Sequence, residues 1–133
     1  MYGDQSTGAG LIISDTDGFI LLVRGSDTGK WSFPKGQAES IDNNRLATAI
    51  RECYEEIGLQ AGKHYVVTDD EPFMCFDRTY FFAYLNNGSE KDIELRHNEV
   101  NDYRWINPSK SCHFWNELNI GVRTYIKMAQ QWN

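Results

Sequence analysis

The chain has 133 residues, of which 41% are apolar and 14% aromatic, a composition that supports a buried core and excludes intrinsic disorder. Its net charge of −6 shows no basic track for long nucleic acids, and its apolar runs are too short for the roughly 20 residues that span a bilayer. No basic segment followed by an apolar core opens the chain. We therefore expect one domain over residues 1–133 that is intracellular, in the cytoplasm, and has no membrane partner.

The first half of the chain predicts two strands, a loop and a helix. Residues 9–14 and 19–25 are apolar and enclose the turn sequence DTDG, which is typical of two connected strands. Residues 26–42 are polar and contain two glycines and a proline, so we expect mainly loop there. From residue 44 the apolar residues recur every three or four positions, which predicts a helix with one buried face. These residues are Leu46, Ala49, Ile50, Cys53 and Ile57.

The ends of this helix are also marked in the sequence. Asp42, Asn43 and Asn44 are all suitable N-cap residues, and Gly58 suits a C-terminal stop.

The cysteines are odd in number and far apart, and they lack metal-binding spacing, so buried reduced thiols are expected. They are Cys53, Cys75 and Cys112.

The second half predicts further strands and a last helix. Residues 64–67 and 73–85 are rich in aromatic and branched side chains, with a bend or hairpin expected at Asp77 and Arg78. Residues 86–92 are expected to be loop, and residues 102–106 a short strand before Pro108. A helix is expected over residues 112–132, with an apolar inner face. That face consists of Leu118, Val122, Tyr125, Ile126 and Met128 or Ala129.

This order of strands, helix, strands, helix predicts an α/β architecture, with a mixed sheet covered by helices.

The first of these helices carries an unusual charge cluster, RECYEEIGL. Glu52, Glu55 and Glu56 are spaced three and four residues apart and lie on one face, where like charges repel. Arg51 is placed to orient a neighbouring carboxylate through its forked guanidinium. The preceding loop, WSFPKG, can bring carbonyl oxygens close. Such oxygen ligands, with substrate phosphates, suit Mg²⁺ and would remove the repulsion.

The stretch GQAESIDNNRLATAIRECYEEIGL, residues 36–59, resembles the signature of the Nudix hydrolases. The matching positions are Arg51, Glu52, Glu55, Glu56, Gly58 and Leu59, with Cys53 in an aliphatic place. The resemblance implies a Nudix-type α/β/α sandwich with the glutamate-rich helix on one face of the sheet. The segment from Gly36 to Arg51 is one residue longer than in the family. A supporting glutamate is expected there, and this chain has Asp42 or Asn43, which leaves the partner of Arg51 open.

The resemblance also implies Mg²⁺-dependent (or Mn²⁺-dependent) cleavage of a diphosphate. Its expected metal ligands are the Gly36 carbonyl and the carboxylates of Glu52, Glu55 and Glu56. Arg51 would orient these groups. The general base would be Glu55, Glu56 or the later Glu99, which is also a possible metal ligand. Expected phosphate-binding side chains are Lys35, Arg24, Lys30 and, as a weaker candidate, Arg78. Four aromatic residues are candidates for stacking on a base, but their spacing favours a place in the core: Tyr80, Phe82, Phe114 and Trp115.

WSFPKG followed by AIRECYEEIGL is most similar to decapping Nudix enzymes, although Gln37 stands where those have a basic residue. The acidic net charge favours a small substrate instead. Dinucleoside polyphosphates and capped RNA 5′ ends rank first, nearly equal. A diphosphoinositol polyphosphate comes third, and a nucleoside triphosphate is a further alternative. A nucleotide- or RNA-binding Nudix module with weak or no hydrolysis is a further alternative, which the intact glutamates disfavour. Monomer and homodimer both stay open.

Overall fold

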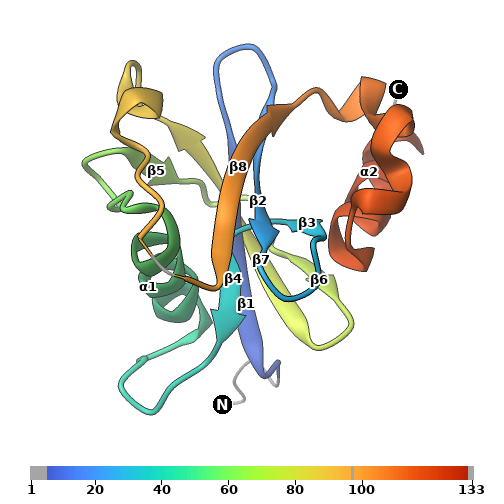
Figure 1. Cartoon of the computed structure of the whole chain (residues 1–133). Helices are drawn as coiled ribbons and strands as arrows, with labels where there is room; N and C mark the ends of the chain where they lie inside the picture. The colour runs from blue at the N-terminus through green and yellow to red at the C-terminus, as the bar shows by residue number, and fades with distance from the viewer. Residues whose placement is uncertain (1–5, 97, 132–133) are drawn as a thin grey trace.

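A mixed sheet of eight strands forms the centre of the structure, a computed structural model that describes residues 6–96 and 98–131 (Figure 1). The strands are β1 Gly8–Ser14, β2 Ile20–Gly25, β3 Trp31–Ser32, β4 Lys35–Gln37, β5 Tyr65–Val67, β6 Phe73–Cys75, β7 Arg78–Leu85 and β8 Val100–Ile106. The helices are α1 Arg45–Ile57 and α2 Ile120–Gln131, with 3₁₀ segments η1 Ser89–Asp92 and η2 Pro108–Glu117.

The main path of the sheet runs β3-β2-β1-β7-β5. β1 pairs with β7 in parallel and with β2 and β4 antiparallel, while β8 lies antiparallel along β2. The parallel register sets Gly8 opposite Arg78, so the start of β7 lies beside the start of β1. β4 pairs with the same end of β1, which brings Lys35 opposite Gly10. This end of the sheet therefore collects segments that are far apart in the sequence.

Both faces of the sheet are buried, each under one helix. Leu11 and Ile13 on β1 belong to the apolar cluster that packs under α1, whereas Ile12 belongs to the cluster that packs under α2. This alternation explains why β1 is a continuous apolar run, because a strand covered on both faces has no solvent side. Figure 1 shows α1 and α2 on opposite sides of the sheet. The predicted α/β/α sandwich with a mixed sheet is confirmed.

Most predicted elements occur near their expected limits. The first two strands, the helix that follows and the strand at residues 64–67 are confirmed. The run 73–85 is a hairpin, with Phe76 and Asp77 between the paired residues Cys75 and Arg78. Of the three cysteines, Cys53 and Cys75 are free and buried as predicted. The structure describes no helix that is both long and apolar enough to cross a membrane.

Two boundaries were wrong. Residues 26–42 are not only loop, because β3 and β4 lie within them and pair with β2 and β1. The last helix begins at Ile120 rather than residue 112, because Leu118 is extended (φ −89°, ψ 142°) and forms a bridge with Trp31. Leu118 is buried as predicted, but not on that helix. The loop expected at 86–92 contains η1, and the Cys112 side chain and Trp132 lie outside the described residues.

Candidate functional site

The direction of the three glutamates is set by the caps and the buried face of α1. The Asn44 side chain accepts a hydrogen bond from the Ala47 N–H (2.8 Å), which fixes the first turn. Gly58 ends the helix in the left-handed region (φ 78°), where glycine carries no Cβ penalty. Ala49, Cys53 and Ile57 are fully buried against the sheet. Beside this buried face, Glu52, Glu55 and Glu56 line a cavity, with Glu56 itself buried.

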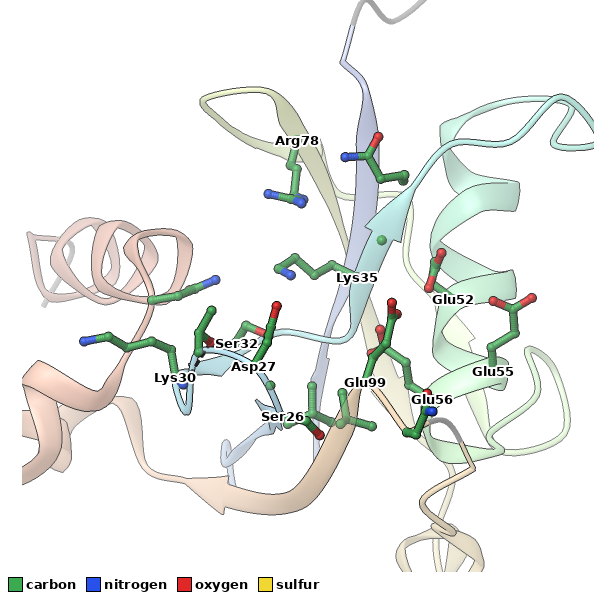
Figure 2. Close-up of a pocket in the computed structure, with 18 of the residues that line it drawn as sticks. Ser26, Asp27, Lys30, Ser32, Lys35, Glu52, Glu55, Glu56, Arg78 and Glu99 are labelled. Carbon is green, nitrogen blue, oxygen red and sulfur yellow. Dashed lines mark hydrogen bonds between the residues drawn. The ribbon is translucent and has the colours of Figure 1, made fainter.

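This cavity has a volume of about 1000 Å³ and collects residues from five separate segments (Figure 2). Its lining includes all the sequence-predicted site residues except Arg51 and Arg24. The predicted residues that line it are Lys30, Lys35, Gly36, Glu52, Glu55, Glu56, Arg78 and Glu99. Figure 2 shows the four glutamates toward α1, and Lys30, Lys35 and Arg78 farther from that helix, with Asp27 between Lys30 and Lys35. The site thus has an acidic half beside α1 and a mainly basic half that also contains Asp27.

Arg51 lies beneath the acidic half and is held by Asp42. Its Nε and Nη2 donate to the two Asp42 oxygens, both at 2.9 Å, and Nη2 also donates to the Gln37 carbonyl (2.9 Å). Its Nη1 lies 3.2 Å from Glu52 Oε2 and 3.1 Å from Glu55 Oε1. The hydrogen bonds from Arg51 hold the pKa of the Asp42 carboxyl well below its usual range. The question of the partner of Arg51 is thereby answered: it is Asp42, reached across the longer loop.

Glu56 is the most buried of the glutamates, with 5% of its surface exposed. Its Oε1 is enclosed and has no hydrogen-bond partner among the residues that the structure describes. Burial, followed by the nearby Glu52 charge, raises the pKa of Glu56 to about 8. Burial also raises the pKa of Glu52. An enclosed carboxylate with one oxygen lacking a partner is unfavourable unless a cation or a proton neutralises it.

Gly36 leaves room for the Glu52 carboxylate. A Cβ on residue 36 would lie 2.0 Å from Glu52 Cδ and 2.2 Å from its Oε2, so any other residue here would displace the Glu52 carboxylate. The Glu52 carboxylate therefore lies directly against the β4 backbone. The Lys35 N–H of the same strand hydrogen-bonds the Glu56 carboxylate. The packing of β4 against α1 therefore fixes the positions of the Glu52 and Glu56 carboxylates relative to each other.

The residues present fit a hard divalent cation by the type of their donors. Carboxylate and carbonyl oxygens are the ligands that Mg²⁺ takes, and the enclosed Glu56 Oε1 is free to act as such a ligand. As the side chains lie, no three or more His, Cys, Asp or Glu of residues 6–96 and 98–131 form a ready metal cluster. Glu52 and Glu55 instead interact with Arg51, which neutralises part of their charge.

The basic half consists of Lys35, Arg78 and Lys30. Burial, with the neighbouring Arg78 charge, lowers the pKa of Lys35. The Arg78 Nε is enclosed and has no hydrogen-bond partner within the described part of the chain. The Lys30 Nζ donates to the Asn116 carbonyl (2.6 Å), so this side chain is already held at the rim. Arg78 and Lys35 are available to bind an anion in the cavity, because neither forms a salt bridge with another of the described residues.

The structure does not bring Arg24 to the cavity. Its Nε donates to Asn101 Oδ1 (2.9 Å), and its guanidinium lies 5.7 Å from the centroid of the buried Trp31 ring. The four aromatic residues weighed for base stacking lie in or against the apolar cluster under α2, as the sequence favoured. They are Tyr80, Phe82, Phe114 and Trp115.

Sequence reasoning did not find several polar residues of the lining. Asp27 and Asn119 line the cavity from the β2–β3 loop and from the start of α2. Asn98 lines it beside Glu99. Their contribution depends on how distant segments meet, and no local pattern marks them.

Comparisons with known proteins identify the family to which the chain belongs. The family model of the NUDIX domain matches residues 4–121. The asymmetrical bis(5′-nucleosyl)-tetraphosphatase of Sus scrofa is 28% identical over 99 residues, which cover 71% of this chain and 67% of that protein. The m7GpppN-mRNA hydrolase of Saccharomyces cerevisiae is 29% identical over 106 residues, covering 76% of this chain but 10% of that protein. The chain thus spans about a tenth of the yeast relative.

The fold is shared with a solved structure. An Ap4A hydrolase of C. elegans, in a binary complex, superimposes with a TM-score of 0.74 at 21% sequence identity. The superposition covers 94% of this chain and 96% of that one. At this level of identity the likeness establishes the fold, over nearly the whole length of both chains.

Proposed function

We propose that this chain, which belongs to the Nudix family of hydrolases, is a Mg²⁺- or Mn²⁺-dependent pyrophosphohydrolase acting on a nucleotide-type substrate. One observation carries the proposal. A single cavity holds Glu52, Glu55, Glu56 and Glu99 on one side and Lys35 and Arg78 on the other. A polyphosphate chain fits between these halves, since its oxygens can bind cations held by the glutamates and the basic side chains directly.

The acidic half would hold the divalent cation. Its ligands would be the carboxylates of Glu52, Glu55 and Glu56 and the carbonyl of Gly36, a residue whose Cβ position lies against the Glu52 carboxylate. Bound Mg²⁺ supplies neutralisation of phosphate charge and activation of a water molecule. Arg51 would then act as a positioning residue, because its guanidinium contacts both Glu52 and Glu55 from below.

Glu99 is our candidate for the general base, with Glu55 as the alternative. Glu99 reaches the cavity from the connection before β8, and its charge contributes to raising the pKa values of Glu52 and Glu56. It is therefore close to the acidic cluster without belonging to the same helix. A base in that place could take a proton from a water held at the cluster. Glu55, in contrast, is paired with Arg51 at 3.1 Å.

Dinucleoside polyphosphates are the substrate class that we favour. The Sus scrofa tetraphosphatase matches over most of both chains, and the cavity volume of about 1000 Å³ is large enough for a nucleotide. A capped RNA 5′ end is the second candidate, supported by the likeness to the yeast m7GpppN-mRNA hydrolase. A diphosphoinositol polyphosphate ranks below both, because the described lining offers only Lys30, Lys35 and Arg78 as cations.

A hydrolysis screen with product identification tests the proposal. Diadenosine tetraphosphate, a capped short RNA, the free cap dinucleotide and a nucleoside triphosphate would each be incubated with Mg²⁺ or with a chelator. We expect Mg²⁺-dependent cleavage of diadenosine tetraphosphate. Glu55→Gln and Glu99→Gln should each reduce the rate on the order of 10²-fold, as expected for loss of a metal ligand or a base.

The matched control is Glu71→Gln, which changes an exposed glutamate outside the cavity lining. It should leave turnover unchanged. Cleavage of capped RNA with diadenosine tetraphosphate untouched would assign the chain to the second substrate class. Tight nucleotide binding without any cleavage would contradict the enzymatic proposal and support a binding module.

A further inference from the structure

The connection that leads into β8 docks on the last turn of α1 just before it reaches Glu99. The Glu94 N–H donates to the Ile57 carbonyl (2.9 Å), and the Arg96 N–H donates to the Glu56 carbonyl (3.0 Å). Carbonyls in the last turn of a helix have no partner within the helix, so these bonds satisfy them. Because Glu56 also points its side chain into the cavity, the connection is placed directly against the acidic cluster.

The Arg96 side chain adds a second contact at the same place. Its guanidinium lies 4.5 Å from the centroid of the Tyr54 ring, a cation–π arrangement on the last turn of α1. Its aliphatic part passes over Gly58, where a Cβ would lie 3.1 Å from Arg96 Cδ. Gly58 therefore ends the helix, and its lack of a side chain also leaves room for Arg96.

The charge of this end of α1 explains why an arginine is favourable here. The last turn has no basic residue of its own, yet it carries Glu55 and Glu56. Negative charge at a helix C-terminus is unfavourable, since the carbonyl ends of the aligned peptide dipoles already give that end a partial negative charge. Arg96, from a different segment, brings the compensating positive charge.

We infer that Arg96 is a positioning residue for Glu99, and that it fixes the Glu99 carboxylate beside Glu52 and Glu56 by anchoring the connection on Tyr54 and Gly58. The second anchor is at Glu99 itself, whose carbonyl accepts a hydrogen bond from the Ser26 N–H (2.8 Å). Glu99 is thus held between α1 and the β2–β3 loop. The inference rests on the proposed function for the role of Glu99 in hydrolysis.

The decisive experiment is a double-mutant cycle of Arg96→Ala and Glu99→Gln, followed by kcat and KM. Arg96→Ala alone should lower kcat about 10-fold, as is usual when a group that orients a site residue is removed, with KM changed less than about twofold. Within the Glu99→Gln background, Arg96→Ala should cause no further loss, because residues that act through one group are not additive. Equal losses in both backgrounds would overturn the inference, as would an unchanged kcat in the single variant.

Two further variants separate positioning from general effects. Arg96→Lys should recover only part of the rate, because lysine keeps the charge but lacks the planar group that stacks on Tyr54. Lys91→Ala removes another exposed cation of the same connection and should leave kcat unchanged. A full loss in Lys91→Ala would indicate an electrostatic effect of the connection as a whole and would contradict a specific role for Arg96.

Amide hydrogen exchange keeps the inference testable if the proposed function fails. Should the wild-type chain cleave no substrate, the exchange rates of the Glu94 and Arg96 amides can still be compared. They should rise in Arg96→Ala and stay unchanged in Lys91→Ala, because only the first variant loses the anchor on α1. Unchanged exchange in Arg96→Ala would overturn the anchor, whatever the activity of the chain.

Discussion

Arg51 and Asp42 form a two-pronged ion pair, with Nε to Oδ1 and Nη2 to Oδ2 both at 2.9 Å. The Asp42 side chain is only 3% exposed, and its Oδ2 also accepts from the Glu39 N–H and the Thr48 hydroxyl, each at 2.9 Å. Asp42 therefore joins the loop after β4 to the first turn of α1 and to Arg51. Since Arg51 contacts Glu52 and Glu55, this pair supports the acidic half of the cavity.

Asp42→Asn should destabilise the fold by about 2 kcal/mol, because it weakens charge-assisted hydrogen bonds that are shielded from water. Urea denaturation would measure the change. The wild-type advantage should hold above pH 4 and be lost in acid, because the folded protein holds the pKa of Asp42 below its ordinary value of 3.8. Asp69→Asn, at an exposed position, is the control. Equal unfolding midpoints for the two variants would contradict the structural role of the pair.

The stability of the metal-free protein should fall as the pH rises from about 5 to 8. The pKa of Glu56 is raised from 4.5 to about 8 in the folded state, so the folded protein keeps a proton that the unfolded chain releases in this window. Stability decreases with pH wherever the folded state binds more protons. Thermal unfolding in a chelator, with Glu56→Gln beside the wild type, measures this. Glu56→Gln should flatten the slope, and an unaltered slope would show that another group is responsible.

Gly36→Ala should abolish most hydrolysis, because the new methyl group would occupy the place of the Glu52 carboxylate. A displacement of about 1 Å at a reacting site costs on the order of 10²-fold in rate. Steady-state kinetics would measure the loss. Gly18→Ala is the control, since Gly18 has open space around its Cβ position but a φ of 84°. It should lower stability through backbone strain while leaving turnover intact. Normal turnover in Gly36→Ala would refute the tight packing of Glu52 on β4.

Arg78→Ala should raise KM for a polyphosphate substrate about 10-fold, because each charge-assisted contact to phosphate contributes roughly 1.5 kcal/mol. The enclosed Arg78 Nε has a donor to offer, and the side chain lines the cavity. Arg24→Ala is a matched control, since Arg24 bonds Asn101 instead and is not among the described lining residues. We expect its KM to match the wild type. A larger effect for Arg24 than for Arg78 would reverse this assignment of the basic half.

The helix that carries the glutamates could be predicted from the sequence with its caps and its buried face. Asn44 is one of the three N-cap residues that the sequence offers, Gly58 is the expected stop, and Ala49, Cys53 and Ile57 recur every four residues. Helix periodicity and capping depend on such near neighbours, so a local pattern is enough to predict them. The same reasoning predicted the strands, but it missed β3 and β4, whose two or three residues are too short to show a period.

The composition of the cavity was decided only by the tertiary structure. The parallel pairing of β1 with β7 places Arg78 opposite Gly8, and the pairing of β4 with β1 brings Lys35 to the same end of the sheet. Arg24 looked equivalent in sequence, yet it bonds Asn101 on the neighbouring β8. The sequence by itself therefore determined which chemical groups α1 presents. Long-range strand pairing and packing, which no local pattern records, determined which of the distant charges face them.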